Sequence, residues 1–287
     1  MTVVIGQHFF EGVIIIADSR SSIQKNGAVV PWRDNTQKIF FLTKDIVISF
    51  AGDVEFAGAI ISFLSDQINK RPKLGILSIF ITKGPRLIKY AYNLLSNKKG
   101  FRDVGFIIAG IDPKRPARVN DSNGKQTGYI NIYDKKVLKV VSPDFETQEA
   151  TIKNPFVIMG SGEQGIEGLE KDFQKLQFGQ FSNNLAFQAV IIETSLRKKI
   201  ESLGIDTVGG LSQIAIIDSQ GARFQGYQGK RDPFEDGDLN VEMIVENGRF
   251  IQKDLKTGKE IKLLYPPEVL SVNEDGSDLF AELDNLK

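Results

Sequence analysis

Four features near the start of the chain carry residue types that could perform hydrolytic chemistry: Thr2, Asp18, Lys38 and the pair Ala51-Gly52. Thr2 stands directly behind Met1, and a small second residue favours removal of the initiator methionine. Removal would leave a hydroxyl and a free α-amino group on one residue. An α-amino group has a pKa of about 7.7–8.0, against about 10.4 for a lysine side chain, so it can accept a proton at neutral pH. Thr2 would then be a nucleophile that carries its own base.

Each of these residues also has a plain structural explanation when it is considered alone. Met-Thr is a common start, Asp18 could end a strand in solvent, Lys38 could be a surface lysine and Gly52 could form a strand-to-helix turn. His8 is the single histidine, and we expect it in a loop. Without a second histidine or a cysteine, a metal site or a Ser-His triad has almost no residues to form from. The ordered set, rather than any one residue, favours an enzyme.

Composition limits the classes of protein that need to be considered. The chain has 287 residues, which suits one large domain or a domain with an appendage. Its 36 basic and 36 acidic side chains balance, so the net charge gives no indication of binding to nucleic acid or to an anionic membrane. The absence of cysteine excludes disulfides and thiolate chemistry. Apolar runs such as 13–17 are too short to span a bilayer, and residues 1–20 show no signal peptide. We therefore expect a soluble cytoplasmic protein.

The first hundred residues alternate between short apolar runs and one helical period. Strands are expected at 2–6, 13–17, 38–42 and 46–51. From Val54 to Ile68 apolar residues recur every three or four positions, which predicts a helix capped by Asp53. A second helix is expected around 85–96, with Pro85 in its first turn. Whether that helix begins earlier, near Leu74, is left open by the pattern.

The middle of the chain repeats this order of strands followed by helices. Strands are expected at 104–111, 129–133, 156–159 and 211–217, a polar loop at 113–128, and helices after Gly160-Ser161-Gly162 and at 184–203. Helix pairs that cover the outer faces of stacked sheets would bury the apolar surface of both faces. We therefore predict an α+β fold with four layers in the order αββα.

These segments together resemble the β-type peptidases of the proteasome, including their bacterial two-component and stand-alone relatives, within the N-terminal nucleophile hydrolases. The matching segments are Thr2 to Arg20, Lys38-Ile39, Phe50-Ala51-Gly52, Val104 to Asp112, Gly160-Ser161-Gly162, and Asp206 with Gly209-Gly210. The resemblance covers residues 1–220 and implies the four-layer αββα sandwich of that family. Residues 221–287 have no counterpart and form a C-terminal extension. It contains expected strands at 239–245, 249–254 and 260–264, hairpin signals at Asn247-Gly248 and Thr257-Gly258, and an acidic tail.

The resemblance also implies a role for each site residue. Thr2 Oγ would be the nucleophile, and its own amine, directly or through a water, would be the base. Lys38 would lower the pKa of that amine and stabilise the oxyanion side of the site, and Asp18 would keep Lys38 charged. The backbone N–H of Gly52 would donate to the tetrahedral oxyanion. This chemistry uses neither a metal nor a cofactor.

Two further residues would orient the threonine amine, namely Ser161 and Asp206. Here the sequence departs from the family signature Asp-x-x-Ser-Gly-Gly, because residues 206–210 read Asp-Thr-Val-Gly-Gly, one residue shorter and without the serine. Thr207 and Ser212 are the candidates to replace it. The segment between Arg20 and Lys38 is also a few residues longer than is usual in the family.

The resemblance places six residues around the primary substrate side chain: Ser21, Thr36, Phe40, Phe50, Val54 and Gly58. None of them is charged. We therefore expect cleavage after apolar or small neutral residues rather than after Lys, Arg, Asp or Glu.

The expected function is that of a threonine peptidase in a self-compartmentalising homo-oligomer. Its substrates would be peptides or unfolded proteins, and an ATP-dependent unfoldase is a candidate partner. One alternative is a small-molecule amidase that uses the same N-terminal chemistry. Another is a catalytically silent scaffold subunit.

Overall fold

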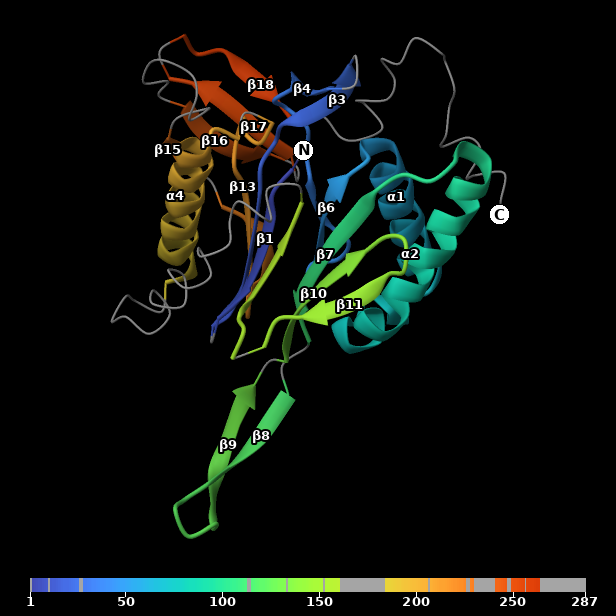
Figure 1. Ribbon diagram of the computed structural model, residues 1–287. Helices are drawn as coiled ribbons and strands as arrows, with labels where there is room; N and C mark the ends of the chain where they lie inside the picture. The colour runs from blue at the N-terminus through green and yellow to red at the C-terminus, as the bar shows by residue number, and fades with distance from the viewer. Residues whose placement is uncertain are drawn as a thin grey trace.

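A computed structural model describes residues 2–9, 11–25, 28–112, 115–132, 134–151, 153–160, 184–205, 207–225, 228–229, 241–246, 249–255 and 257–263. Within these ranges the fold is α+β, with three α-helices and several sheets whose strand pairings are all antiparallel. Two five-stranded sheets form the body, and the helices lie against them (Figure 1).

The first sheet has the strand order β12-β1-β2-β13-β14. Its strands are β1 (Val4–His8), β2 (Gly12–Ala17), β12 (Phe156–Met159), β13 (Gln213–Asp218) and β14 (Gly221–Phe224). Every residue of β2 is buried, which explains why this strand is continuously apolar instead of alternating. The expected strands at 2–6, 13–17, 156–159 and 211–217 are confirmed, with ends shifted by one or two residues.

The second sheet has the strand order β11-β10-β7-β6-β5. Its strands are β5 (Ile39–Phe41), β6 (Ile46–Gly52), β7 (Val104–Ile111), β10 (Lys135–Val141) and β11 (Glu146–Glu149). The predicted strands at 38–42, 46–51 and 104–111 are confirmed. β10 and β11 were not predicted, because β10 has only three buried residues among its lysines and β11 has none. Val137 belongs to the cluster between the two sheets, and Leu138 and Val140 belong to the cluster beneath α1 and α2.

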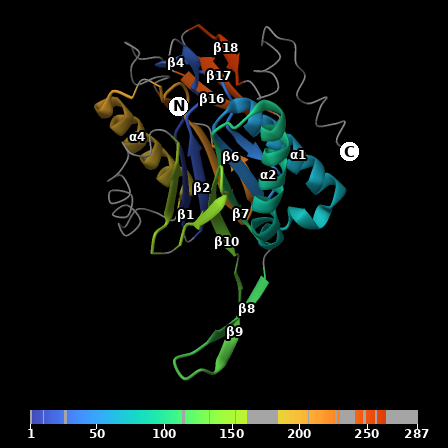
Figure 2. The same ribbon diagram turned by 45° about the vertical axis from the view of Figure 1, so that its right-hand side comes forward.

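Helices pack on the outer face of each sheet (Figure 2). α1 (Val54–Lys70) and α2 (Leu77–Lys99), with the 3₁₀ turn η1 (Pro72–Gly75) between them, share one apolar cluster with the second sheet. α4 (Leu185–Leu203) shares another with the first sheet. A third cluster contains residues of both sheets, including Ile15 of β2 and Ile107 of β7. The inner faces of the two sheets therefore pack against each other.

The helices predicted at 54–68, 85–96 and 184–203 are confirmed, except that Pro85 does not lie in a first turn. Asp53 caps α1, because its Oδ1 accepts the Phe56 N–H at 3.0 Å. Pro85 lies inside α2, more than two turns after Leu77, and not in a first turn. The residue at the N-cap of α2 is Ile76, which offers no capping side chain, so no local signal marked the true start.

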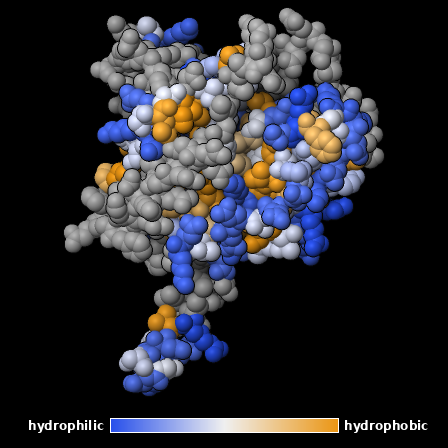
Figure 3. Space-filling view, viewed as in Figure 1, coloured by the Kyte–Doolittle hydropathy of each residue, from blue (hydrophilic) through white to orange (hydrophobic). Residues whose placement is uncertain are grey.

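The polar loop expected at 113–128 is wrong, because most of it forms a hairpin. β8 (Arg115–Asn120) pairs with β9 (Gln126–Ile132), and the pair projects from the body (Figure 1). Asp121 Oδ1 accepts the N–H groups of Asn123 and Lys125, both at 2.9 Å, and closes the turn. The side chains described in this hairpin, those of residues 118–128, are mostly hydrophilic (Figure 3).

Two smaller sheets complete the described structure. β3 (Ser21–Lys25) and β4 (Ala28–Arg33) form a hairpin within the long segment between Arg20 and Lys38. β15 (Gln228–Gly229), β16 (Val241–Glu246), β17 (Arg249–Asp254) and β18 (Glu260–Lys262) form a four-stranded sheet, which confirms the three strands expected in the extension. The expected helix after Gly160-Ser161-Gly162, the Asn247-Gly248 turn and the acidic tail lie outside the described residues. Among the helices described, none combines the length and apolar character needed to cross a membrane.

Candidate active site

Lys38 is the centre of a buried polar cluster and is 1% exposed. Its Nζ donates to Thr2 Oγ1 at 2.9 Å and to Asp18 Oδ1 at 2.8 Å. A third bond goes to the backbone carbonyl of Arg20. Three acceptors around one nitrogen match the three N–H donors of an ammonium group, whereas a neutral amine has only two. The structure therefore brings together Thr2, Asp18 and Lys38, which are far apart in the sequence.

Burial sets the electrostatics of this lysine. Removal of Lys38 from water disfavours its charged form and lowers its pKa below the usual value for lysine. Asp18 opposes this shift, because both its charge and its hydrogen bond favour the ammonium. The carboxylate is thus the main group that keeps a proton on Lys38 in this apolar setting.

Strand pairing explains why Thr2 lies beside Asp18. β1 and β2 are antiparallel and Val4 pairs with Ala17, so the start of one strand meets the end of the other. The Val3 N–H donates to Asp18 Oδ1 at 3.0 Å, and the Asp18 N–H donates to the Val3 carbonyl at 3.3 Å. Lys38 reaches this point from the second sheet, directly before β5. The cluster therefore joins the two sheets.

The Asp18 carboxylate is fixed by four donors. Oδ1 accepts from Lys38 Nζ and the Val3 N–H, and Oδ2 accepts from the N–H groups of Arg20 at 3.2 Å and Gly209 at 3.3 Å. Three of these donors are backbone groups, whose positions the fold determines. Asp18 can therefore hold the lysine in one geometry without moving itself.

Gly52 ends β6 and lies at the junction with the N-terminus of α1. Its φ is +99°, and an added Cβ would lie 2.2 Å from the Asp103 carbonyl oxygen, so only glycine fits. It is exposed, whereas the neighbouring Ala51 is buried. The Phe50 N–H donates to the Lys38 carbonyl at 3.2 Å. Gly52 is therefore only two residues away from a direct contact with the Lys38 backbone.

Gly160 contacts the first residues of the chain. Its φ is +115°, and a Cβ there would lie 1.8 Å from the carbonyl oxygen of Thr2. The segment 160–162, which the resemblance placed at the site, therefore begins against Thr2. Ser161 and Asp206, the two residues expected to orient the threonine amine, lie outside the described residues, as does Met1.

The turn at 209–211 was expected only as a glycine signature, and it binds the end of β2. The Gly209 carbonyl accepts the N–H groups of Ser19 at 3.3 Å and Arg20 at 3.0 Å. The Leu211 N–H donates to Ser19 Oγ at 2.7 Å. A Cβ on Gly210, whose φ is +72°, would lie 2.5 Å from Ser19 Oγ. These contacts explain the glycine pair by close approach to the residues next to Asp18.

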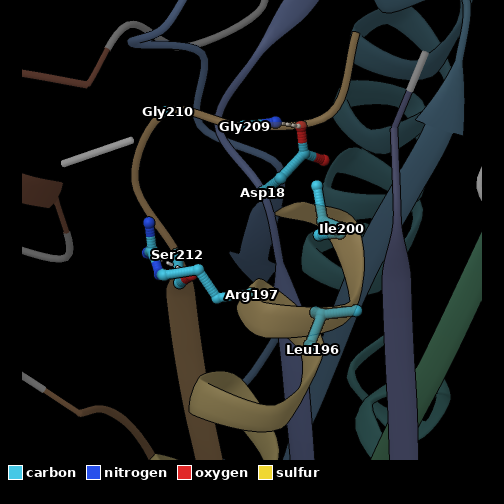
Figure 4. Close-up of a pocket in the computed structure, with 7 residues that line it drawn as sticks. All are labelled: Asp18, Leu196, Arg197, Ile200, Gly209, Gly210 and Ser212. Carbon is cyan, nitrogen blue, oxygen red and sulfur yellow. Dashed lines mark hydrogen bonds between the residues drawn. The ribbon is translucent and has the colours of Figure 1, made fainter. Parts of the chain in front are cut away.

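Ser212, a candidate for the missing serine, is held by α4. Its Oγ donates to Glu193 Oε1 at 2.7 Å and accepts from Arg197 Nη2 at 2.8 Å, and Arg197 also pairs with Glu193 at 2.6 Å. The one O–H donor of Ser212 is thus used on α4. Figure 4 shows Arg197 directed at Ser212, with Asp18 on the far side of a pocket of about 20 Å³, which is room for a single water molecule. Besides Asp18, six residues line this pocket: Leu196, Arg197, Ile200, Gly209, Gly210 and Ser212.

The predicted substrate-pocket residues fall into two groups. Phe40, Phe50 and Val54 share the apolar cluster beneath α1, with the rings of Phe40 and Phe50 stacked at 6.3 Å between centroids, and Gly58 is buried in the same helix. Phe50 is 0% exposed. The hydroxyls of Ser21 and Thr36 are buried and hydrogen-bonded to each other. All six residues are uncharged.

Two polar groups at this site escaped sequence reasoning. Arg20 forms a bidentate pair with Asp34, at 2.6 Å and 3.0 Å, which braces the backbone next to Asp18. Gln213 is 0% exposed at the first position of β13. The only local signal is that this glutamine directly precedes the apolar run 214–217, and such a signal does not show which groups the side chain contacts. In comparisons with known proteins, no protein-family model and no curated protein matches the chain.

Proposed function

We propose that this chain is a threonine peptidase with the four-layer αββα fold of the N-terminal nucleophile hydrolases. The single observation that best supports the proposal is the buried Lys38 ammonium, which donates to Thr2 Oγ1 and to Asp18 at once. A lysine aimed at the hydroxyl of the second residue is of little use to folding, but it is what a threonine nucleophile needs. Two facing sheets with helices packed on their outer faces support the proposed fold.

The proposed reaction begins once Met1 has been removed. The free amine of Thr2 takes the hydroxyl proton, directly or through a water, and Oγ attacks the scissile carbonyl. Lys38 stabilises the charge that develops at Oγ, and the Gly52 N–H donates to the oxyanion. The intermediate collapses to an ester on Thr2, and the leaving amine takes the proton from the α-amine. Water then attacks the ester, the carboxylic acid departs, and the hydroxyl is restored.

The pocket residues support cleavage after small or apolar residues, because none of the six carries a charge. The working form would be a homo-oligomer in the cytoplasm that takes in peptides or unfolded proteins, with an ATP-dependent unfoldase as partner.

One observation favours a second candidate, a catalytically silent scaffold subunit. Thr2 is 5% exposed, and a substrate carbonyl must reach its Oγ.

The deciding experiment is covalent labelling with a β-lactone or epoxyketone probe, measured by intact mass and N-terminal sequencing. Protein that begins at Thr2 should take up one probe per chain, and Thr2→Ala should take up none. Thr82→Ala, which removes an exposed hydroxyl on α2, is the matched control and should label like the wild type. Labelling of Thr2→Ala, or full peptide hydrolysis by protein that still carries Met1, would reject the mechanism. Native mass spectrometry tests the assembly separately.

A further inference from the structure

Gln213 connects the backbones of the two segments that carry the site. Its Nε2 donates to the carbonyls of Asp18 at 3.2 Å and Thr36 at 2.9 Å. Its Oε1 accepts the N–H groups of Lys38 at 2.8 Å and Ile39 at 3.3 Å. The side chain is fully buried, so no water competes for these bonds.

Only a carboxamide can make this set of bonds. It supplies two N–H donors and two oxygen lone pairs, and all four are used here. The partners also decide which end is nitrogen, because two carbonyls face one side and two N–H groups face the other. A carboxylate has no donor for the carbonyls, and an apolar side chain would leave four buried backbone groups unpaired.

Gln213 provides a link that strand pairing does not. Asp18 follows β2 in the first sheet, and Lys38 precedes β5, the edge strand of the second sheet. β2 and β5 are not hydrogen-bonded neighbours. The β3–β4 hairpin and a bond from the Thr36 N–H to the Ser19 carbonyl at 3.0 Å join the two segments, but these bonds do not involve the backbone of Asp18 or of Lys38. Ser212, the residue before Gln213, is held from the opposite side, because it bonds to Glu193 and Arg197 of α4. Gln213 is therefore a fixed reference point for both segments.

We propose that Gln213 is a positioning residue, which holds the Asp18 and Lys38 backbones at the separation that lets Lys38 Nζ contact both Thr2 Oγ1 and Asp18 Oδ1. This inference rests on the proposed threonine-hydrolase function. Gln213 does not touch the reacting atoms, so its effect is on the rate of the chemical step and not on substrate affinity.

The test compares Gln213→Met with Gln7→Met. Both glutamines are buried in the first sheet, at 0% and 1% exposure, but Gln7 lies towards the far end of β1 from Thr2. Probe labelling of Thr2 in protein lacking Met1 is followed from pH 5 to 10, with saturation separating affinity from maximal rate. Gln213→Met should lower the maximal rate about 100-fold, the cost of a displacement of about 1 Å, and shift the alkaline limb of the profile, with unchanged affinity. Gln7→Met should leave rate and profile unchanged.

Gln213→Glu provides a second variant of nearly the same shape. It keeps the acceptor for Lys38 and Ile39 but loses both donors while ionised. Its rate relative to wild type should rise as the pH falls, because a protonated carboxyl recovers one donor. Wild-type rate and profile in both Gln213 variants, or equal losses in Gln213→Met and Gln7→Met, would overturn the positioning role. Failure of both Gln213 variants to fold, judged by circular dichroism, would also overturn it in favour of a structural role. A wild type that takes up no probe would reject the proposed function itself.

Discussion

Replacement of Asp18 by asparagine tests the electrostatic account of the site most directly. Asn has the shape of Asp but no charge, and it can still accept one bond from Lys38 Nζ. Its amide group would face the Arg20 and Gly209 N–H groups, which now donate to Oδ2. The variant therefore leaves the buried Lys38 ammonium without a counter-charge. It also places the amide N–H groups of the asparagine against the backbone N–H groups of Arg20 and Gly209, which are donors as well. Breaking a buried pair in this way typically costs about 3–5 kcal/mol.

The loss should depend on pH in a defined direction. Burial already lowers the pKa of Lys38, and Asp18 is the main group that opposes the shift. Without Asp18 the pKa falls further, so the variant lysine is neutral over a range in which the wild-type lysine is charged. In that range the unfolded variant binds one more proton than the folded variant, and its free energy of unfolding rises by about 1.4 kcal/mol per pH unit. The wild type gains no such increment there, so the stability deficit of Asp18→Asn should narrow as the pH rises from neutral towards 10.

The assay is urea unfolding of wild type and variant by circular dichroism at several pH values between 6 and 10. Asp34→Asn is the control, because Asp34 pairs with Arg20 and is more exposed than Asp18, at 21% against 6% of the side chain. Its deficit should be smaller and should depend less on pH, because Asp34 raises the pKa of Lys38 through its charge alone and less than Asp18 does. A deficit of Asp18→Asn that stays constant from pH 6 to 10 would refute the claim that the carboxylate keeps the lysine charged.

Two further substitutions test the remaining parts of the site. Gly52→Ala should lower Thr2 labelling about 10²–10³-fold, since the displaced N–H no longer serves the oxyanion. Gly100→Ala has a similar positive φ of +80° but no neighbour within 4 Å of its added Cβ, so it should share the backbone strain and keep the labelling rate. Equal rates in the two alanine variants would contradict the role of Gly52. Phe50→Ala should cost about 3–5 kcal/mol of stability and let probes with larger aromatic side chains react faster than in the wild type. An unchanged ranking of probes in a competition assay would show that Phe50 does not limit the pocket.

The parts of the fold that the sequence predicts are those with strong local signals. β2 is a run of buried β-branched residues, and α1 combines a helical period with a capping aspartate, so each could be placed without tertiary information. The failures have the opposite cause. β10 has as many lysines as buried residues and every residue of β11 is exposed, and the β8–β9 hairpin is closed by a turn inside a polar segment.

The candidate site divides in the same way. Thr2, Asp18, Lys38 and Gly52 were named through the resemblance to a known family, and the first three contact one another as expected. Gln213 and the pair of Arg20 with Asp34 could not. Gln213 bonds to backbone groups 174 to 195 residues away in the sequence, and Arg20 meets Asp34 at the base of the β3–β4 hairpin, which was not predicted. Neither secondary-structure propensity nor hydrophobic periodicity indicates which backbone groups a buried glutamine contacts.

The lysine itself gives the strongest physical reason to expect a function. A buried ion pair seldom stabilises a fold, because the cost of removing two charges from water offsets their attraction, and apolar residues of similar volume often do as well or better. Lys38 and Asp18 are 1% and 6% exposed, and they adjoin strands of two different sheets, β5 and β2. Perturbed charges that structure does not require concentrate at sites that bind or react. Here the charge is directed at one hydroxyl, that of Thr2, and the proposed nucleophile is the reading of the site that makes use of it.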